Sequence, residues 1–164
     1  MFSKSFGYAL KGILYLSLQH QEKKYIQAEE IATALNVPRH FMGKVLKLLA
    51  KEGILSSNKG PAGGFSVNEI TGSKSLMDLL RTTKGGVSDL ENCALHFVPC
   101  DSINPCPIHN QVACIRKEIS EHLSSTTIRE MLKENKEDLM NALINPGKKK
   151  LESKKWGSLI SLNL

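Results

Sequence analysis

"AEEIATALNVPRHFMGKVLKLLAKEGILSSNKGPAGGFSV" spans residues 28–67, and its changing periodicity decides the fold. Apolar residues at steps of three and four predict a short helix over 28–35, because this spacing places them on one helical face. Pro38 suits the first turn of a second helix, where its missing N–H is not needed. We expect that helix to run to about Glu52, with Gly53 as its C-terminal cap. Two helices joined by a short turn form a helix-turn-helix.

Residues 54–67 change from a helical pattern to a strand pattern. A short apolar run, a turn rich in glycine and proline, and a second apolar run predict a β-hairpin. A hairpin directly after the second helix of a helix-turn-helix is the wing of a winged-helix domain. The alternative is an unrelated helical domain with a surface hairpin.

The flanking segments predict further helices. Residues 3–20 predict an amphipathic helix. A long helix from about Ile108 carries an apolar stripe, and the capping box of Thr127 and Glu130 predicts the start of one last helix. The stripe needs a partner that this chain is too short to supply, so we expect a homodimer. The predicted fold class is mainly α with a small β-hairpin: a winged helix-turn-helix domain plus a long dimerisation helix.

Charge is spread unevenly along the 164 residues and supports a division into parts. Residues 1–83 carry a net charge of +5, residues 84–145 a net charge of −3, and the tail from 146 onward a net charge of +4. A basic N-terminal half fits a polyanionic partner. We expect a winged helix-turn-helix DNA-binding domain at 1–83, a cysteine-rich loop at 84–107, dimerisation and C-terminal helices at 108–145, and a basic, disordered tail at 146–164.

The N-terminal segment indicates no export or membrane insertion. Lys4, Lys11 and Gly12 interrupt its apolar stretch, and it lacks the small-residue cleavage site of a secretory signal. The stretch also falls short of a membrane span. We therefore expect a cytoplasmic protein. In that reducing compartment, clustered cysteines favour metal binding or redox chemistry over structural disulfides.

All four cysteines lie within residues 93–114, and two residues separate the third of them from His109. Structural zinc sites usually pair their ligands as Cys-x2–4-Cys, and this segment has no such pair. Three thiolates and one imidazole instead suit an iron–sulfur cluster, although zinc is not excluded. Cys114 is expected to be a core residue of the long helix, with a role as a fallback ligand as the alternative.

Several motifs together resemble the Rrf-two family of winged-helix transcription regulators, in particular its iron–sulfur-binding members of the IscR and NsrR type. The resemblance covers residues 2 to about 135. The resemblance rests on the segment "YALKGILYLSL", the helix pair "LNVPRHFMGKVLKLLAKEGIL", the wing "SNKGPAGGFSV", a Cys-x6-Cys-x5-Cys-x2-His loop and the segment "LSSTTIREML".

The resemblance implies a homodimer, not an enzyme, whose cluster state controls its affinity for a palindromic operator in double-stranded DNA. A two-iron two-sulfur cluster is favoured over a four-iron four-sulfur cluster. In NsrR-like members an acidic residue of the partner's first helix is the fourth ligand, but Gly7 and Tyr8 occupy that place here. The expected ligands are Cys93, Cys100, Cys106 and His109.

Residues for DNA contact are expected on the second helix of the helix-turn-helix and on the wing. Side chains in the first turn of such a helix reach base edges, and basic side chains one and two turns further on reach phosphates. Lys59 stands where the family has a wing arginine, and the wing glycines allow close approach to the minor groove. The expected contacts are Arg39, His40, Lys44, Lys47, Lys59, Gly60, Gly63 and Gly64.

The sequence allows two other interpretations. The loop could hold structural zinc or no metal, which would make the chain a plain transcription repressor. The chain could also be a redox protein that uses the cluster. The second is disfavoured because no flavin, nicotinamide or phosphate-binding glycine motif is present, and because it leaves the basic helix-turn-helix unexplained.

Overall fold

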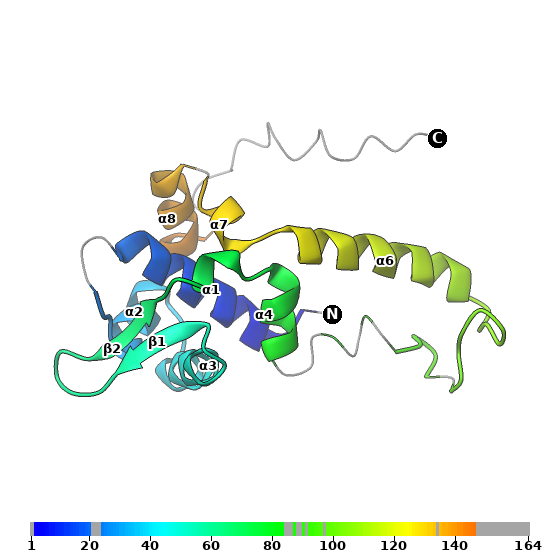
Figure 1. The fold of residues 1–164 in the computed structure, drawn as a ribbon, viewed down its shortest axis with the longest axis horizontal. Helices are drawn as coiled ribbons and strands as arrows, with labels where there is room; N and C mark the ends of the chain where they lie inside the picture. Colours follow the sequence, from blue (N-terminus) through cyan, green and yellow to red (C-terminus); the bar gives the residue numbers. More distant parts are fainter. Residues whose placement is uncertain are drawn as a thin grey trace.

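A computed structural model of the chain describes residues 2–20, 24–83, 87, 90, 92–96, 98–133 and 135–146. Helices form most of this part of the chain, together with one antiparallel pair of strands, which confirms the predicted fold class (Figure 1). The elements in chain order are α1 (Lys4–Gln19), α2 (Ala28–Ala34), α3 (Arg39–Lys51), β1 (Leu55–Asn58), β2 (Gly64–Val67), a 3-10 turn (Thr71–Ser73), α4 (Leu76–Thr82), α6 (His109–Ser125), α7 (Ile128–Met131) and α8 (Lys136–Ile144).

The first helix lies at the centre of the hydrophobic core. It contacts α2, α3, α4, α8 and β2, so both the helix-turn-helix and the last helix, α8, pack on it. A Cβ added at Gly12 would lie 3.2 Å from Leu46 Cδ2 and 3.3 Å from Met42 Sδ, which shows how closely α1 and α3 approach. The core is mainly aliphatic. Its fully buried side chains include Ile13, Leu16, Ile31, Leu46, Leu49, Leu79, Leu80 and Ile128.

The helix-turn-helix ends where the sequence pattern places its end. Gly53 follows α3 with φ +71°, a left-handed conformation that glycine adopts without strain. The chain then enters β1, which pairs with β2 in the register Leu55 to Val67. The second strand also bridges to Ile26, because Phe65 and Ile26 exchange backbone hydrogen bonds of 2.8 and 3.0 Å. This bridge fixes the wing to the segment that precedes α2.

A second short bridge joins the start of α4 to the start of α7. Ser75 and Thr127 are paired, with Leu76 N–H donating to Thr126 O at 2.9 Å and Ile128 N–H donating to Lys74 O at 3.0 Å. Both partners are also helix caps. Ser75 forms a capping box in α4 and Thr127 forms one in α7, as the sequence predicts for the latter.

The prediction of a single last helix after Thr127 is wrong, because two helices, α7 and α8, follow instead. The first, α7, ends at Met131. Asn135 then starts α8, and its side chain accepts a hydrogen bond from Glu137 N–H at 3.0 Å. This second N-cap interrupts an apolar pattern that is otherwise continuous with one helix. Most of the tail expected at 146–164 lies outside the described residues.

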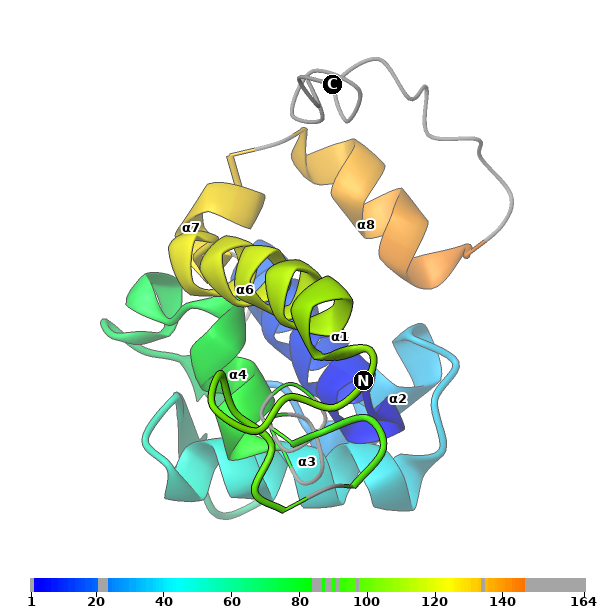
Figure 2. The ribbon, with the colours of Figure 1, turned by 90° about the vertical axis from the view of Figure 1, so that its right-hand side faces the viewer.

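The long helix α6 extends away from the rest of the chain, as Figure 1 shows. Its apolar stripe is only covered at its C-terminal end, where Leu123 is buried, whereas Ile115 is 55% exposed. The cysteine-containing segment lies at the opposite, N-terminal end of α6 (Figure 2). The described part of this chain therefore leaves the stripe open, as the sequence predicts.

Candidate metal centre and nucleic-acid interface

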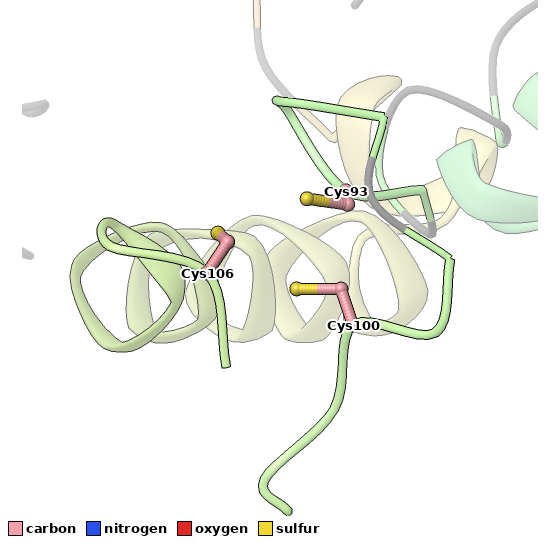
Figure 3. A group of neighbouring side chains, drawn as sticks. All are labelled: Cys93, Cys100 and Cys106. Carbon is pink, nitrogen blue, oxygen red and sulfur yellow. The ribbon is translucent and has the colours of Figure 1, made fainter. Parts of the chain in front are cut away.

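Three of the four cysteines converge at the free end of α6. The Sγ atoms of Cys93, Cys100 and Cys106 all lie within 4.8 Å of one another, and Figure 3 shows the Cys93 and Cys100 side chains pointing toward the side on which Cys106 lies. Cys106 is buried, while Cys93 and Cys100 are half-buried. The structure thus brings together three of the four predicted ligands from positions spread over fourteen residues of sequence.

An aspartate between two of the cysteines shapes this loop. The Oδ1 atom of Asp101 accepts hydrogen bonds of 2.8 Å from the backbone N–H groups of Ile103 and Asn104. These donors hold the pKa of Asp101 below its ordinary value. Such an Asx turn reverses the chain directly after Cys100 and returns it toward Cys106. Asp101 is not among the predicted site residues, although an aspartate followed by Ser, Ile, Asn and Pro is a recognisable turn signal.

The predicted fourth ligand lies beside the three thiols. His109 is the first residue of α6, and its backbone N–H donates to Cys106 O at 2.9 Å. Its Nδ1 atom lies 3.2 Å from Cys100 Sγ. The imidazole therefore contacts the Cys100 thiol, and the backbone hydrogen bond to Cys106 fixes the position of His109.

The donor set fits a thiophilic metal or an iron–sulfur cluster. The backbone N–H of Cys106 lowers the pKa of the Cys100 thiol, but desolvation and the neighbouring Cys93 and Cys106 thiols raise it more, so the net shift is upward. Crowded sulfur atoms resist ionisation because their charges repel. A positively charged metal centre reverses this preference and binds thiolates directly.

The fourth cysteine does not belong to this group. Cys114 lies on the exposed surface of α6, and its Sγ atom is 3.7 Å from Glu118 Oε1. The expectation that Cys114 is a core residue is therefore wrong for the single chain. The reason is that Cys114 lies in the N-terminal half of α6, whereas the buried residue of this helix, Leu123, lies near its C-terminal end.

The basic residues predicted for DNA contact lie on one helix and on the wing. Arg39, His40, Lys44 and Lys47 are all exposed on α3, so none of them serves the core. Lys59 is exposed in the loop between β1 and β2. The arrangement presents positive side chains from both parts of the winged helix.

Two of the three wing glycines have a role within the fold. A Cβ at Gly64 would overlap the carbonyl oxygen of Ile26, and a Cβ at Gly63 would overlap that of Asn58. Gly64 also has φ +138°. Gly60 differs, since it is exposed with φ +105° and a Cβ there would meet nothing within 4 Å. The fold of the wing thus leaves no room for a side chain at Gly63 or Gly64. At Gly60 a side chain would have room, and only the positive φ favours glycine there.

One ion pair on this surface was not anticipated from the sequence. Arg39 Nη1 lies 2.6 Å from Glu29 Oε1 in α2. The sequence places Glu29 in the first turn of a helix, where the dipole favours it, but ten residues of separation hide its proximity to Arg39.

The comparisons with known proteins agree with this architecture. A family model described as Rrf2, iron-dependent transcriptional regulator, matches residues 2–134. The chain belongs to the Rrf2 family. A relative from Aquifex aeolicus (strain VF5), described as an HTH-type transcriptional regulator, is 31% identical over 134 residues, which are 80% of this chain and 91% of the relative.

Solved structures of Rrf2-like regulators share the fold. CymR (YrzC), the global cysteine regulator of B. subtilis, has a TM-score of 0.65 at 20% identity, covering 82% of this chain and 98% of that chain. T. potens IscR has a TM-score of 0.61 at 20% identity, covering 81% and 86%. The chain is thus a transcriptional regulator and not an enzyme. Among the described residues, no helix is both long enough and apolar enough to cross a membrane.

Proposed function

We propose that this Rrf2 regulator binds a palindromic DNA operator as a homodimer, with an affinity set by the state of an iron–sulfur cluster. The observation that carries this proposal is the convergence of the Cys93, Cys100 and Cys106 sulfur atoms within 4.8 Å at the end of a helix whose apolar stripe is open. The family to which the chain belongs is described as iron-dependent, which agrees with a metal at this place.

The proposed ligands are the three thiolates and the imidazole of His109. Three thiolates and one imidazole favour a two-iron two-sulfur cluster, with a four-iron four-sulfur cluster as the alternative. Such a cluster supplies a centre that gains or loses one electron and is lost under oxidative attack. The chain's part is to hold the donors: Asp101 turns the loop, and the first turn of α6 carries His109.

The proposed DNA-binding surface consists of the exposed side of α3 and the wing. Arg39 and His40, in the first turn of α3, are placed to reach base edges in the major groove. Lys44, Lys47 and Lys59 would contact phosphates, which supply most of the affinity and make it depend on salt. Gly60 would let the wing backbone approach the minor groove, while Gly63 and Gly64 hold the wing in shape.

The proposed homodimer follows from the uncovered stripe on α6. Its half-exposed residues include Val112 and Ile119, and Ile115 is exposed. Pairing with α6 of a second copy would bury this surface, and the two-fold axis would present two α3 helices to a palindrome.

Each segment of the chain has its own role in the proposed function. Residues 1–83 bind DNA, residues 84–107 hold the cluster and residues 108–145 form the dimer. The loop that carries the cysteines connects the end of α4 to the start of α6. A change at the metal centre would therefore reach the DNA-binding domain through α4 and the dimer helix. A cytoplasmic location is part of this proposal, since the operator that the protein would bind lies on chromosomal DNA.

Purification without oxygen tests the proposal directly. The full chain is expected to be brown or red, with iron and acid-labile sulfide in equal amounts, and to select a palindromic sequence from a random duplex library. Exposure to an oxidant that removes the cluster should change the affinity for the selected duplex. A colourless protein with one zinc per chain, whose DNA affinity ignores oxidants, would instead identify a plain repressor with structural zinc.

A further inference from the structure

The arginine at the start of α3 is held by an acidic side chain of the preceding helix. The Arg39–Glu29 ion pair, 2.6 Å between Nη1 and Oε1, joins the two helices of the helix-turn-helix. Its side chains are 70% and 53% exposed. The pair therefore lies on the surface that the proposed function places against DNA.

The ion pair has little value for folding, because water screens an exposed pair. Its electrostatic setting is specific, however. The first turn of α3 contains no acidic residue, and Pro38 at its N-cap provides no side-chain hydrogen bond. A cation at a helix N-terminus is disfavoured by the helix dipole. Glu29 supplies the negative charge that this end of α3 lacks and that Arg39 needs.

The pairing changes what Arg39 offers to DNA. A guanidinium has five N–H donors in a planar fork, so contact with one carboxylate oxygen orients the fork and leaves donors for a base edge. Reading a guanine requires that orientation, whereas attraction to phosphate requires mainly net positive charge. The Glu29 carboxylate offsets part of the positive charge of Arg39 and favours one orientation of its donors.

The other predicted DNA-binding cations differ from Arg39 in their contacts. Within the part of the chain that the structure describes, Lys44, Lys47 and Lys59 form no ion pair. Their charge remains available to phosphates. In addition, Gln27 Nε2 donates to Pro61 O at 2.9 Å, which ties the start of α2 to the wing loop and fixes the backbone that carries Glu29.

We propose that Glu29 is a specificity-determining residue of the DNA-binding surface. It positions the Arg39 guanidinium for base recognition and suppresses its attraction to DNA of any sequence. The inference rests on the proposed function, in that α3 must face DNA.

The test uses the full chain, purified without oxygen, and two duplexes of equal length: one selected by the parent protein from a random library and one unselected. Glu29→Gln removes the charge with little change in shape. Glu30→Gln is the matched control, since it removes the same charge from the next residue of the same helical turn. Arg39→Gln is combined with Glu29→Gln to test whether the two residues act together. Thermal unfolding verifies that each variant is folded.

Glu29→Gln is expected to bind the unselected duplex several-fold more tightly, and to steepen the slope of log affinity against log salt by about one, because Arg39 becomes free to contact a phosphate. The ratio of affinities for the two duplexes should fall by roughly fivefold, within the range that one bidentate base contact provides. Glu30→Gln should raise both affinities alike and leave the ratio unchanged.

Two results would overturn the inference. One is an equal effect of Glu29→Gln and Glu30→Gln on the affinity ratio, which would reduce Glu29 to a general negative charge. The other is an effect of Glu29→Gln that persists in the Arg39→Gln background. If the parent selects no sequence, the proposed function fails and this inference with it. If the parent discriminates between the duplexes and Glu29→Gln leaves the affinity ratio unchanged, only this inference fails.

Discussion

The Nδ1 atom of His109 lies 3.2 Å from the Sγ atom of Cys100, across a loop in which the two residues are nine positions apart. The contact places an imidazole at the edge of a group of three thiols. It is the structural reason for treating His109 as a ligand candidate and for comparing it with Cys114, the cysteine of α6 that lies outside the group of three.

Replacement of His109 should show whether this residue is a ligand of the proposed cluster. His109→Cys is expected to retain the cluster with a lower reduction potential, because a thiolate donates more charge than a neutral imidazole. His109→Ala should yield a labile cluster and an altered DNA affinity. Redox titration followed by absorbance gives the potential. Identical potentials for parent and His109→Cys would remove His109 from the ligand set.

The three converging thiols should each be necessary. Cys93→Ala, Cys100→Ala and Cys106→Ala are expected to lose the cluster, since each leaves iron without a thiolate. Cys114→Ala is the matched control, because its sulfur lies outside the group of three. Iron and acid-labile sulfide per chain, measured without oxygen, provide the comparison. Loss of the cluster in Cys114→Ala together with its retention in His109→Ala would exchange the roles proposed for these two residues.

The wing lysine should contribute one phosphate contact. Lys59→Ala is expected to reduce the slope of log affinity against log salt by about one unit. Lys136→Ala provides the control, because Lys136 is exposed at the start of α8, away from α3 and the wing (Figure 1). Fluorescence anisotropy over a series of salt concentrations measures both slopes. Equal slopes for the two variants would place Lys59 away from the phosphates.

Two glycines of the first helix should respond in different ways to alanine. A Cβ at Gly7 would meet nothing within 4 Å, so Gly7→Ala should stabilise the protein by up to about 1 kcal/mol. At Gly12 the same change presses on the buried Leu46 and Met42 side chains, and overpacking of this kind costs about 1–3 kcal/mol. Chemical denaturation should therefore rank Gly7→Ala above Gly12→Ala in stability. The reverse order would mean that α1 and α3 separate easily.

The capping box of α4 should make stability depend on acid pH. The backbone N–H of Ser75 donates to Asp78 Oδ2 at 3.0 Å and holds the pKa of Asp78 below its ordinary value of 3.8. A lowered folded-state pKa adds stability above the ordinary pKa, and this is lost as pH falls through the folded pKa. Thermal unfolding of Asp78→Asn should show a smaller loss below pH 4 than the parent shows. Parallel curves would exclude Asp78 as a source of the acid sensitivity.

The sequence predicts the winged helix well because local signals mark each of its boundaries. The spacing of apolar residues, Pro38 at the start of α3 and Gly53 at its end all act within a few residues, so no tertiary information is needed. The division of the last helix was missed for the opposite reason: Asn135 competes with a continuous apolar pattern, and only packing decides which signal prevails.

The sequence names candidate donors by residue type but does not give their distances in space. Cys93, Cys100, Cys106 and His109 are candidates because thiols and imidazoles bind metals, and the structure brings the sulfur atoms of the three cysteines together. The ion pair of Glu29 with Arg39 depends on how two helices cross, and the exposure of Cys114 depends on where α6 leaves the core. Neither is encoded by local spacing.

The bridge between Ser75 and Thr127 makes α6 a lever with its fulcrum at the body of the protein and the cysteine loop at its far end. Its 17 residues give an arm of about 25 Å at 1.5 Å per residue. A turn of about 5° at the fulcrum moves the far end by roughly 2 Å, the scale of helix shifts at switching interfaces. A shift of roughly 2 Å imposed on the loop by the proposed metal centre would, in turn, rotate the winged helix by only about 5° about the same fulcrum.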